Sequence, residues 1–273
     1  MPSRESRTVR REPMAAKVPE ITLMFWVLKI IATGMGEATS DYLGSVSVAL
    51  SASIGVIGLI VALVLQFRAK RYIAPIYWLV VVMVAIVGTG AADSLHGLLH
   101  VPYIGSTALY AVVLAVVLYL WHRSEGTLDI HSIVTRRREV FYWLTVFATF
   151  ALGTATGDLT ASSFGLGYLP SGIMFAVIIL VPAVAWWRFR MNEVFAFWFA
   201  YVITRPLGAS FADWFGKPPP GAVGLGDGTV SGVATIALVV LVAYVTITKK
   251  DIQQQPVPVP VRAAELASLP RRP

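Results

Sequence analysis

The sequence predicts an all-α membrane protein with eight transmembrane helices, arranged as four tandem two-helix repeats. Of its 273 residues, 56% are hydrophobic and only 14% are charged, whereas soluble domains carry about 25% charged residues. The same prediction follows from eight long apolar stretches and from a fourfold internal repeat. The chain contains no cysteine, which excludes disulfides, thiolate metal sites and a cysteine nucleophile.

Each predicted helix is an apolar stretch long enough to cross a bilayer, which takes about 20 residues. In chain order these stretches cover residues 21–43, 46–67, 73–95, 103–121, 140–159, 169–187, 194–215 and 229–247. The first follows a basic segment, but it is too long and too charged for a secretory signal, so we expect an uncleaved span. Pro206 predicts a kink in the seventh stretch because proline removes a helical hydrogen bond.

The basic residues are distributed unevenly between the connections. The two tails and the second, fourth and sixth connections hold 19 of the 22 Lys and Arg residues, whereas the odd-numbered connections hold only Lys217. Cytoplasmic loops carry an excess of Lys and Arg. We therefore expect both termini to be cytoplasmic, with every odd-numbered helix running outward.

The expected domain organisation places the repeats between two polar tails. The tails cover residues 1–19 and 251–273, and the repeats cover residues 20–72, 73–136 with a cytoplasmic linker, 137–190 and 191–250. The composition of the tails predicts disorder. Basic tails are typical of contact with anionic lipids, and these lack the interleaved aromatic residues of a nucleic-acid-binding segment, so we expect the lipid bilayer but no nucleic acid as a partner.

The odd-numbered stretches share a pattern that defines the internal repeat. Each begins with an aromatic residue followed by Trp, with a Gly ten residues after the Trp and an Asp fifteen residues after it. The matching positions are Trp26, Trp78, Trp143 and Trp198; Gly36, Gly88, Gly153 and Gly208; and Asp41, Asp93, Asp158 and Asp213. We expect the glycines to permit close helix approach and the tryptophans to form an aromatic belt at the membrane interface.

The repeat also constrains the symmetry of the protein. Each unit contains an even number of spans, so all units cross the membrane in the same sense, and a symmetry axis must lie along the membrane normal. Two arrangements remain open: a pseudo-fourfold ring, or two halves that rock against each other.

With its tryptophan-containing repeat of two transmembrane segments, this chain resembles a family of uncharacterised bacterial integral membrane proteins. That family is defined by a tandem "repeat of unknown function", usually present in four copies, and the resemblance covers about residues 20 to 248. It implies the repeat architecture and a location in the bacterial inner membrane. It implies no substrate, so function must be inferred from the residues.

Seven ionisable residues lie within the predicted spans. They are Lys29, Glu37, Asp41, Asp93, Asp158, Arg205 and Asp213. As ionised groups they carry two positive and five negative charges, a sum of −3, and isolated charges are costly in a bilayer. Carboxylate and hydroxyl oxygens without thiolates favour hard cations, including Mg²⁺, Mn²⁺, Ca²⁺ and alkali ions.

These residues suggest a transporter or channel for a hard cation. Coupling of the cation to protons is one form of this hypothesis. The four repeated Asp residues would form an ion-binding ring toward the outer side, with Glu37 deeper and with Thr89 and Thr154 one turn before two of the aspartates. Lys29 and Arg205 would serve as counter-ions. A divalent cation would then be a substrate, and no resident cofactor is expected.

A structural alternative remains open for the same aspartates. Each could accept hydrogen bonds from the backbone N–H groups that begin the following helix. The protein would then be a non-transporting scaffold or accessory subunit, with Lys29 and Arg205 neutralising two of the acids.

Two further motifs give weaker predictions. His96 and His100 follow Asp93 at helical spacing and could form an external metal site. The string from Gly224 to Asp227 occurs in a class of intramembrane aspartyl proteases, but here it lies in a loop rich in Gly and Pro, where we expect a turn. No constellation predicts hydrolase or haem chemistry, so we expect no enzyme activity. A homo-oligomer is compatible with the sequence.

Overall fold

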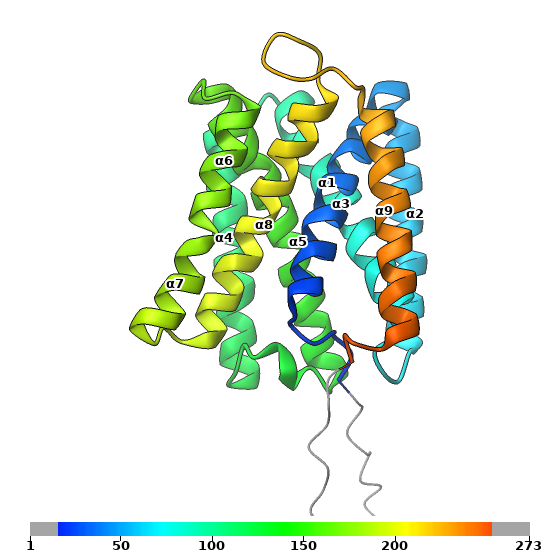
Figure 1. Ribbon diagram of the computed structural model, residues 1–273, viewed down its shortest axis with the longest axis vertical. Coiled ribbons are helices and arrows are strands. Elements are labelled where there is room, and N and C mark those ends of the chain that lie inside the picture. The colour runs from blue at the N-terminus through cyan, green and yellow to red at the C-terminus, as the bar shows by residue number, and fades with distance from the viewer. Residues whose placement is uncertain (1–15, 253–273) are drawn as a thin grey trace, which may run out of the picture.

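The computed structural model describes residues 16–252, and its regular structure is helical throughout this range (Figure 1). The long helices are α1 (Leu23–Val46), α2 (Val48–Arg68), α3 (Ala74–Gly97), α4 (Tyr103–Glu125), α5 (Arg136–Asp158), α6 (Tyr168–Ile178), α7 (Leu180–Phe189), α8 (Glu193–Gly216) and α9 (Asp227–Thr248). Two short turns, η1 (Ile130–Ser132) and the π-helical η2 (Leu159–Ser163), flank α5. The predicted all-α fold is confirmed.

Seven helical segments in the described range are long and apolar enough to cross a membrane. Two of these differ from the predicted spans: η2 extends α5, and the sixth span is divided into α6 and α7. Pro182 accounts for the division because it cannot donate to the carbonyl of Ile178. Helix α1 has a comparable length of 24 residues, but it carries three charged residues, Lys29, Glu37 and Asp41.

The first helix of each repeat belongs to an inner ring, formed by α1, α3, α5 and α8. In this inner ring α1 packs on α3, α3 on α5, α5 on α8, and α8 on α1. The second helix of each repeat lies outside and packs on the inner helix of the next repeat: α2 on α3, α4 on α5, α6 on α8, and α9 back on α1. Of the two arrangements that the repeat allows, the chain adopts the closed ring (Figure 1).

Burial separates the two layers. Among the candidate spans, between 50% and 67% of the residues in α3, α5 and α8 are buried, but only between 11% and 22% in the outer segments. The outer helices expose large apolar side chains, including Ile57 and Ile60 on α2 and Val233 and Ile236 on α9. The outer helices therefore present a largely apolar surface, whereas large exposed apolar patches are uncommon on soluble proteins.

The repeated glycines bring the inner helices together, as expected. A Cβ atom added to Gly36 would collide with Ala85 on α3, and one added to Gly88 would collide with Phe150 on α5. The two remaining contacts follow the same cyclic order: Gly153 meets Arg205 and Pro206 on α8, and Gly208 meets Thr33 on α1. The same residue therefore performs the same packing role at all four contacts of the inner ring.

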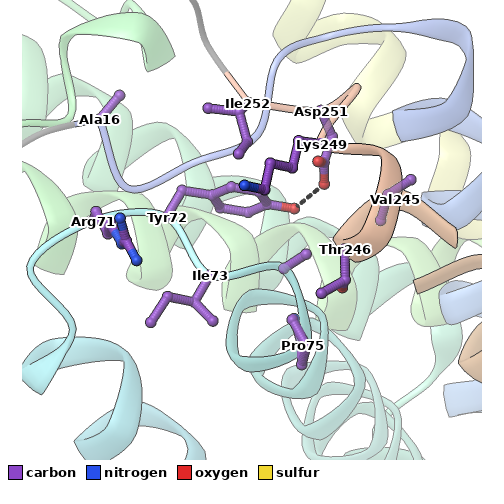
Figure 2. A pocket seen from close by; sticks show the side chains of 11 residues that line it. Ala16, Arg71, Tyr72, Ile73, Pro75, Val245, Thr246, Lys249, Asp251 and Ile252 are labelled. Atoms are coloured by element: carbon purple, nitrogen blue, oxygen red, sulfur yellow. Dashed lines mark hydrogen bonds between the residues drawn. The ribbon is translucent and has the colours of Figure 1, made fainter. Parts of the chain in front are cut away.

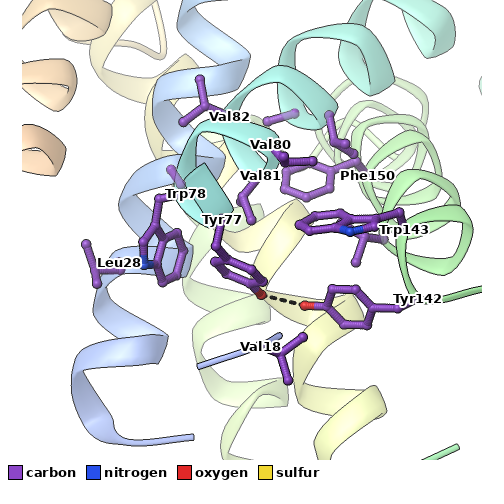
Figure 3. Close-up of a cluster of buried hydrophobic side chains, with 14 of the residues drawn as sticks. Val18, Leu28, Tyr77, Trp78, Val80, Val81, Val82, Tyr142, Trp143 and Phe150 are labelled. Atoms are coloured by element: carbon purple, nitrogen blue, oxygen red, sulfur yellow. Dashed lines mark hydrogen bonds between the residues drawn. The ribbon is translucent and has the colours of Figure 1, made fainter. Parts of the chain in front are cut away.

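The prediction that the repeated tryptophans form an exposed aromatic belt is wrong. Trp78, Trp143 and Trp198 are between 2% and 6% exposed, and only Trp26 is half-buried. Each ring packs against the aromatic residue that precedes it and against the corresponding aromatic residue of a neighbouring repeat (Figure 3). The aromatic residue and Trp that recur in each repeat therefore build a common aromatic core between the inner helices.

Both ends of the described chain lie at the same end of the bundle, which we call the tail end (Figure 1). Lys17 and Val18, expected in a disordered tail, are instead buried there. Lys17 Nζ donates to Glu139 Oε2 at 2.6 Å and to the carbonyl of Gln66 at 3.1 Å. Burial lowers the pKa of Lys17, although the adjacent Glu139 carboxylate opposes this shift. The expected disorder of residues 1–15 and 253–273 concerns segments outside the described residues.

A cavity of about 460 Å³ also opens at the tail end, between the end of α9 and the start of α3 (Figure 2). Within it the Tyr72 hydroxyl donates to Asp251 Oδ2 at 2.6 Å, and Lys249 lies beside this pair. None of the predicted ion-binding residues lines this cavity.

Candidate functional site

Three carboxylates meet at the opposite end of the inner ring, which we call the acidic end. One carboxylate oxygen each from Glu37, Asp41 and Asp213 lies within 4.8 Å of the other two. Glu37 and Asp41 project from α1 one turn apart, and Asp213 belongs to the last turn of α8. The backbones of α1 and α8 approach closely near Gly34 and Gly208. This packing brings acids from the first and fourth repeats together.

Lys217, the residue that follows α8, is inserted into this acidic end. Its Nζ atom lies 2.5 Å from Asp41 Oδ2, 3.4 Å from Asp227 Oδ2 and 3.9 Å from Asp213 Oδ1. Burial alone would lower the pKa of Lys217, but the carboxylates of Asp41 and Asp213 outweigh it and hold the pKa above its ordinary value. The Lys217 ammonium group is therefore a tethered cation, held by the chain next to carboxylates that would also attract a free cation.

A second layer of polar groups crosses the centre of the inner ring next to these acids. Arg205, which is fully buried, forms an ion pair with Glu37 and also donates to the Thr89 hydroxyl. It donates further to Thr154 Oγ1 at 2.7 Å and to the carbonyl of Thr33 at 3.3 Å. Thr89 in turn donates to Glu37 Oε2 at 3.0 Å. Each inner helix contributes a group to this layer.

The repeat explains how this central layer arises. Eleven residues after the repeated Trp, the four units carry Glu37, Thr89, Thr154 and Ala209. The small Ala209 leaves the fourth place open, and Arg205 reaches it from one turn earlier on α8. The four positions are equivalent in the repeat but carry different side chains. The inner ring therefore holds one ion pair at its centre, between Glu37 and Arg205, with two hydroxyls beside it.

The structure brings together only part of the predicted ring of aspartates. Asp41 and Asp213 belong to the compact group, whereas Asp93 and Asp158 do not. Asp93 and Asp158 lie at the same end of α3 and α5 and are half-buried, and within residues 16–252 their side chains form no ion pair or hydrogen bond. Thr89 and Thr154 face the centre as expected, but they hold the Glu37–Arg205 pair.

The two predicted counter-ions have different surroundings. Arg205, predicted as a counter-ion without a named partner, forms an ion pair with Glu37. Lys29 does not pair with an acid: its Nζ atom lies over the rings of Phe150 and Tyr201, at 3.8 and 4.1 Å from their centres. The counter-ion role expected for Lys29 is therefore wrong, because two turns of α1 separate it from the nearest predicted acid, Glu37.

The external metal site predicted for two histidines is not assembled. His96 Nδ1 lies 3.0 Å from the carbonyl of Val101, and its ring stacks on Tyr103. His100 is exposed and has a positive φ of 56°. In the described part of the chain, neither belongs to a group of three potential metal ligands.

The structural alternative also fails in its predicted form. The start of α2 is capped by the Ser47 side chain. In the other three repeats, the outer helix begins without a side-chain cap, at α4, α6 and α9. No repeated aspartate within residues 16–252 accepts a hydrogen bond from the start of the following helix. The acids at the acidic end are tied together through Lys217 instead.

Lys217 and Asp227 are site residues that sequence reasoning missed. Asp227 is the first residue of α9, whereas Gly224 to Gly226 lie in the loop before it, so the string that resembles a protease motif does not lie within a helix. Two signals pointed to Lys217. It is the only basic residue in an odd-numbered connection, and it follows Asp213 by four residues, the spacing at which helical side chains meet.

Comparison with known proteins agrees with the repeat architecture. A family model described as Repeat of Unknown Function (DUF347) matches residues 24–72, 76–127, 141–192 and 196–251. Each matched segment contains one inner helix and the outer helix that follows it. No curated protein and no solved structure matches the chain.

Proposed function

Since the chain belongs to the Repeat of Unknown Function (DUF347) family, whose name carries no activity, we propose from the site itself that this protein transports a hard cation across a membrane. The observation that carries the proposal is the convergence of Glu37, Asp41 and Asp213 at one end of the inner ring. Oxygen-only ligands of this kind suit Mn²⁺, Mg²⁺ and Ca²⁺.

A bacterial inner membrane is the proposed location, with the tail end in the cytoplasm. The apolar outer helices support the membrane part of this proposal. Basic residues support the orientation, because the connections at the tail end carry most of them and the acidic end carries Lys217. In this orientation the carboxylates open toward the outer side.

Charge supports binding of a cation at the acidic end. Glu37, Asp41, Asp213 and Asp227 contribute four negative charges, and the two cations that touch them, Arg205 and Lys217, contribute two positive charges. The sum is −2, and Asp93 and Asp158 lower it to −4 when they are ionised. A low-dielectric site favours a bound cation or protons over this excess.

The central ion pair supports a carrier rather than an open pore. Arg205 and Glu37 fill the axis of the inner ring, and both side chains are buried. A cation held at the acidic end would have to exchange places with Arg205 at Glu37 before moving further. Transport would therefore require a change in this layer, and it would be slower than conduction through a channel.

The test measures Mn²⁺ uptake into liposomes that contain the purified protein and an enclosed dye quenched by Mn²⁺. We expect uptake by the unmodified chain and loss of at least nine-tenths of it in Asp41→Asn and Asp213→Asn. Glu193→Gln is the matched control, because it removes an exposed acid from the other end of α8. Equal uptake in all four proteins would overturn the proposal.

A non-transporting scaffold remains the second candidate, and one observation favours it. Lys217 connects Asp41 on α1, Asp213 on α8 and Asp227 on α9, so these acids could serve only to hold three helices together. In that case Asp41→Asn lowers the melting temperature, while the unmodified chain neither binds nor moves Mn²⁺.

A further inference from the structure

Lys29 is a buried ionisable group that the proposed cation site does not use. Its side chain is 1% exposed, and its amino group has no hydrogen-bond partner. Within the described residues, Lys29 takes part in no ion pair. Its Nζ atom lies over the ring faces of Phe150 and Tyr201. Cation–π contact is weak compensation for a charge removed from water.

The groups that surround Lys29 leave its charge unbalanced. On α8 it faces Tyr201 and, one turn further, Arg205, whose guanidinium also lies near the Phe150 ring of α5 at 5.1 Å. On α1 the nearest acid is Glu37, which is already paired with Arg205. Two further tyrosines belong to the same aromatic core as Tyr201: Tyr142 on α5 and Tyr77 on α3, whose hydroxyls lie 2.5 Å apart (Figure 3). Of the two basic groups, Arg205 is therefore paired with a carboxylate and Lys29 is not.

The two basic groups differ in their chemistry. A guanidinium keeps its proton under all conditions met by proteins, whereas a buried lysine amine can exist in a charged or a neutral form. Lys29 is therefore the group on this axis whose charge can change when the charge at the acidic end changes.

We propose that Lys29 is the proton-carrying group of the protein, which exchanges a cation at the acidic end for a proton. This inference rests on the proposed function. When a divalent cation binds to Glu37, Asp41 and Asp213, an N–H bond of the Lys29 ammonium breaks. The nitrogen keeps the electron pair and the proton passes to water. When the cation leaves, the amine takes up a proton again.

The separation of the two sites allows effective coupling. Eight residues of α1 separate Lys29 from Glu37, which corresponds to about 12 Å along a helix. At an effective dielectric constant of about 20, each unit charge at that distance changes a protonation equilibrium about tenfold. A divalent cation would therefore shift the Lys29 equilibrium by about a hundredfold.

Tyrosine hydroxyls on the tail-end side of Lys29 could provide a route for the proton. The Tyr201 hydroxyl is buried without a hydrogen-bond partner, and the linked hydroxyls of Tyr77 and Tyr142 lie in the same aromatic core toward the tail end (Figure 3). Hydroxyls can both donate and accept. Exchange with the tail end would separate the proton from the cation, which binds at the acidic end.

The test counts protons released when Mn²⁺ binds to the full chain in detergent. The solution is lightly buffered at pH 8 and contains a pH indicator, and bound Mn²⁺ is measured in parallel. We expect the unmodified chain to release about one proton more per bound Mn²⁺ than Lys29→Met. Lys250→Met is the matched control, because Lys250 is exposed at the tail end, and it should release as many protons as the unmodified chain.

A second variant keeps the test decisive if Lys29→Met does not fold. Lys29→Arg preserves the positive charge but cannot lose its proton. We therefore expect this variant to bind Mn²⁺ about tenfold more weakly than the unmodified chain and to release about one proton fewer per bound Mn²⁺. Release of the full number of protons by either Lys29 variant would overturn the coupling role and leave the cation site standing. Absence of Mn²⁺ binding by the unmodified chain would overturn the proposed function, and this inference with it.

Discussion

Arg205 and Glu37 form an ion pair at the centre of the inner ring, where both side chains are closed off from solvent. Hydroxyls from Thr89 and Thr154 form hydrogen bonds to this pair. Because the four groups come from four different helices, the pair links all the repeats at one level. Its stability and its ability to rearrange bear on every proposal for this protein.

The first prediction concerns the removal of Arg205. Arg205→Met leaves the Glu37 carboxylate buried without its partner, so we expect the free energy of unfolding to fall by about 3–5 kcal/mol. Chemical unfolding followed by tryptophan fluorescence measures the change. Arg123→Met, at an exposed position on α4, should have little effect. Adding Glu37→Gln to Arg205→Met should recover part of the loss, and an unchanged loss would contradict this explanation.

The second prediction tests the glycine contacts of the inner ring. Gly36→Ala places a methyl group against Ala85 and should destabilise the protein by about 1–3 kcal/mol. Gly44→Ala on the same helix meets nothing within 4 Å, so it should be neutral or stabilising by up to about 1 kcal/mol. Melting temperatures of both variants test this, and an equal response would show that helix approach at Gly36 is not critical.

The third prediction separates cation binding from a structural role at the acidic end. Lys217→Met removes the tethered cation next to Asp41 and Asp213, so we expect the dissociation constant for Mn²⁺ to fall about tenfold. Titration calorimetry gives this constant, with Lys250→Met as the exposed control. If Lys217 only holds the helices together, the variant loses stability with no gain in affinity for Mn²⁺.

The fourth prediction concerns the pH dependence of stability at the tail end. Burial lowers the pKa of Lys17 in the folded chain, so unfolding takes up a proton at this residue. Stability must therefore rise with pH through the interval between the folded pKa and the ordinary lysine value of about 10.4. Unfolding experiments across pH 8 to 10 should show a smaller rise in Lys17→Met than in the unmodified chain. Lys70→Met, at an exposed position, should leave the rise unchanged.

The sequence predicts the helices and repeats well because both depend on local periodicity. Apolar stretches of bilayer length and the repeated Trp and Gly correspond to helices and to the contacts between them. From the sequence alone, the closed ring could not be distinguished from an arrangement of two halves that rock against each other. That choice depends on α9 packing back on α1, a contact between the two ends of the chain.

Side-chain partners were harder to predict than positions. Charge alone predicted that Arg205 neutralises a buried acid, but it did not single out Glu37. The surroundings of Lys29 depend on two aromatic rings from other helices. The tryptophans were misplaced because an amphipathic ring near a helix end suits a membrane interface and a buried core equally well. The location depends on whether the helix face that carries the Trp points to the lipid or to the other inner helices. A single sequence does not determine this direction.

The central claim is that the acidic end of the inner ring holds a hard cation, and the position of bound Mn²⁺ tests it most directly. Crystals grown with Mn²⁺ should show an anomalous difference peak within about 2.5 Å of carboxylate oxygens of Glu37, Asp41 and Asp213. The Lys217 amino group should have moved away from Asp41. A density map that lacks this peak while Lys217 still contacts Asp41 would contradict the claim.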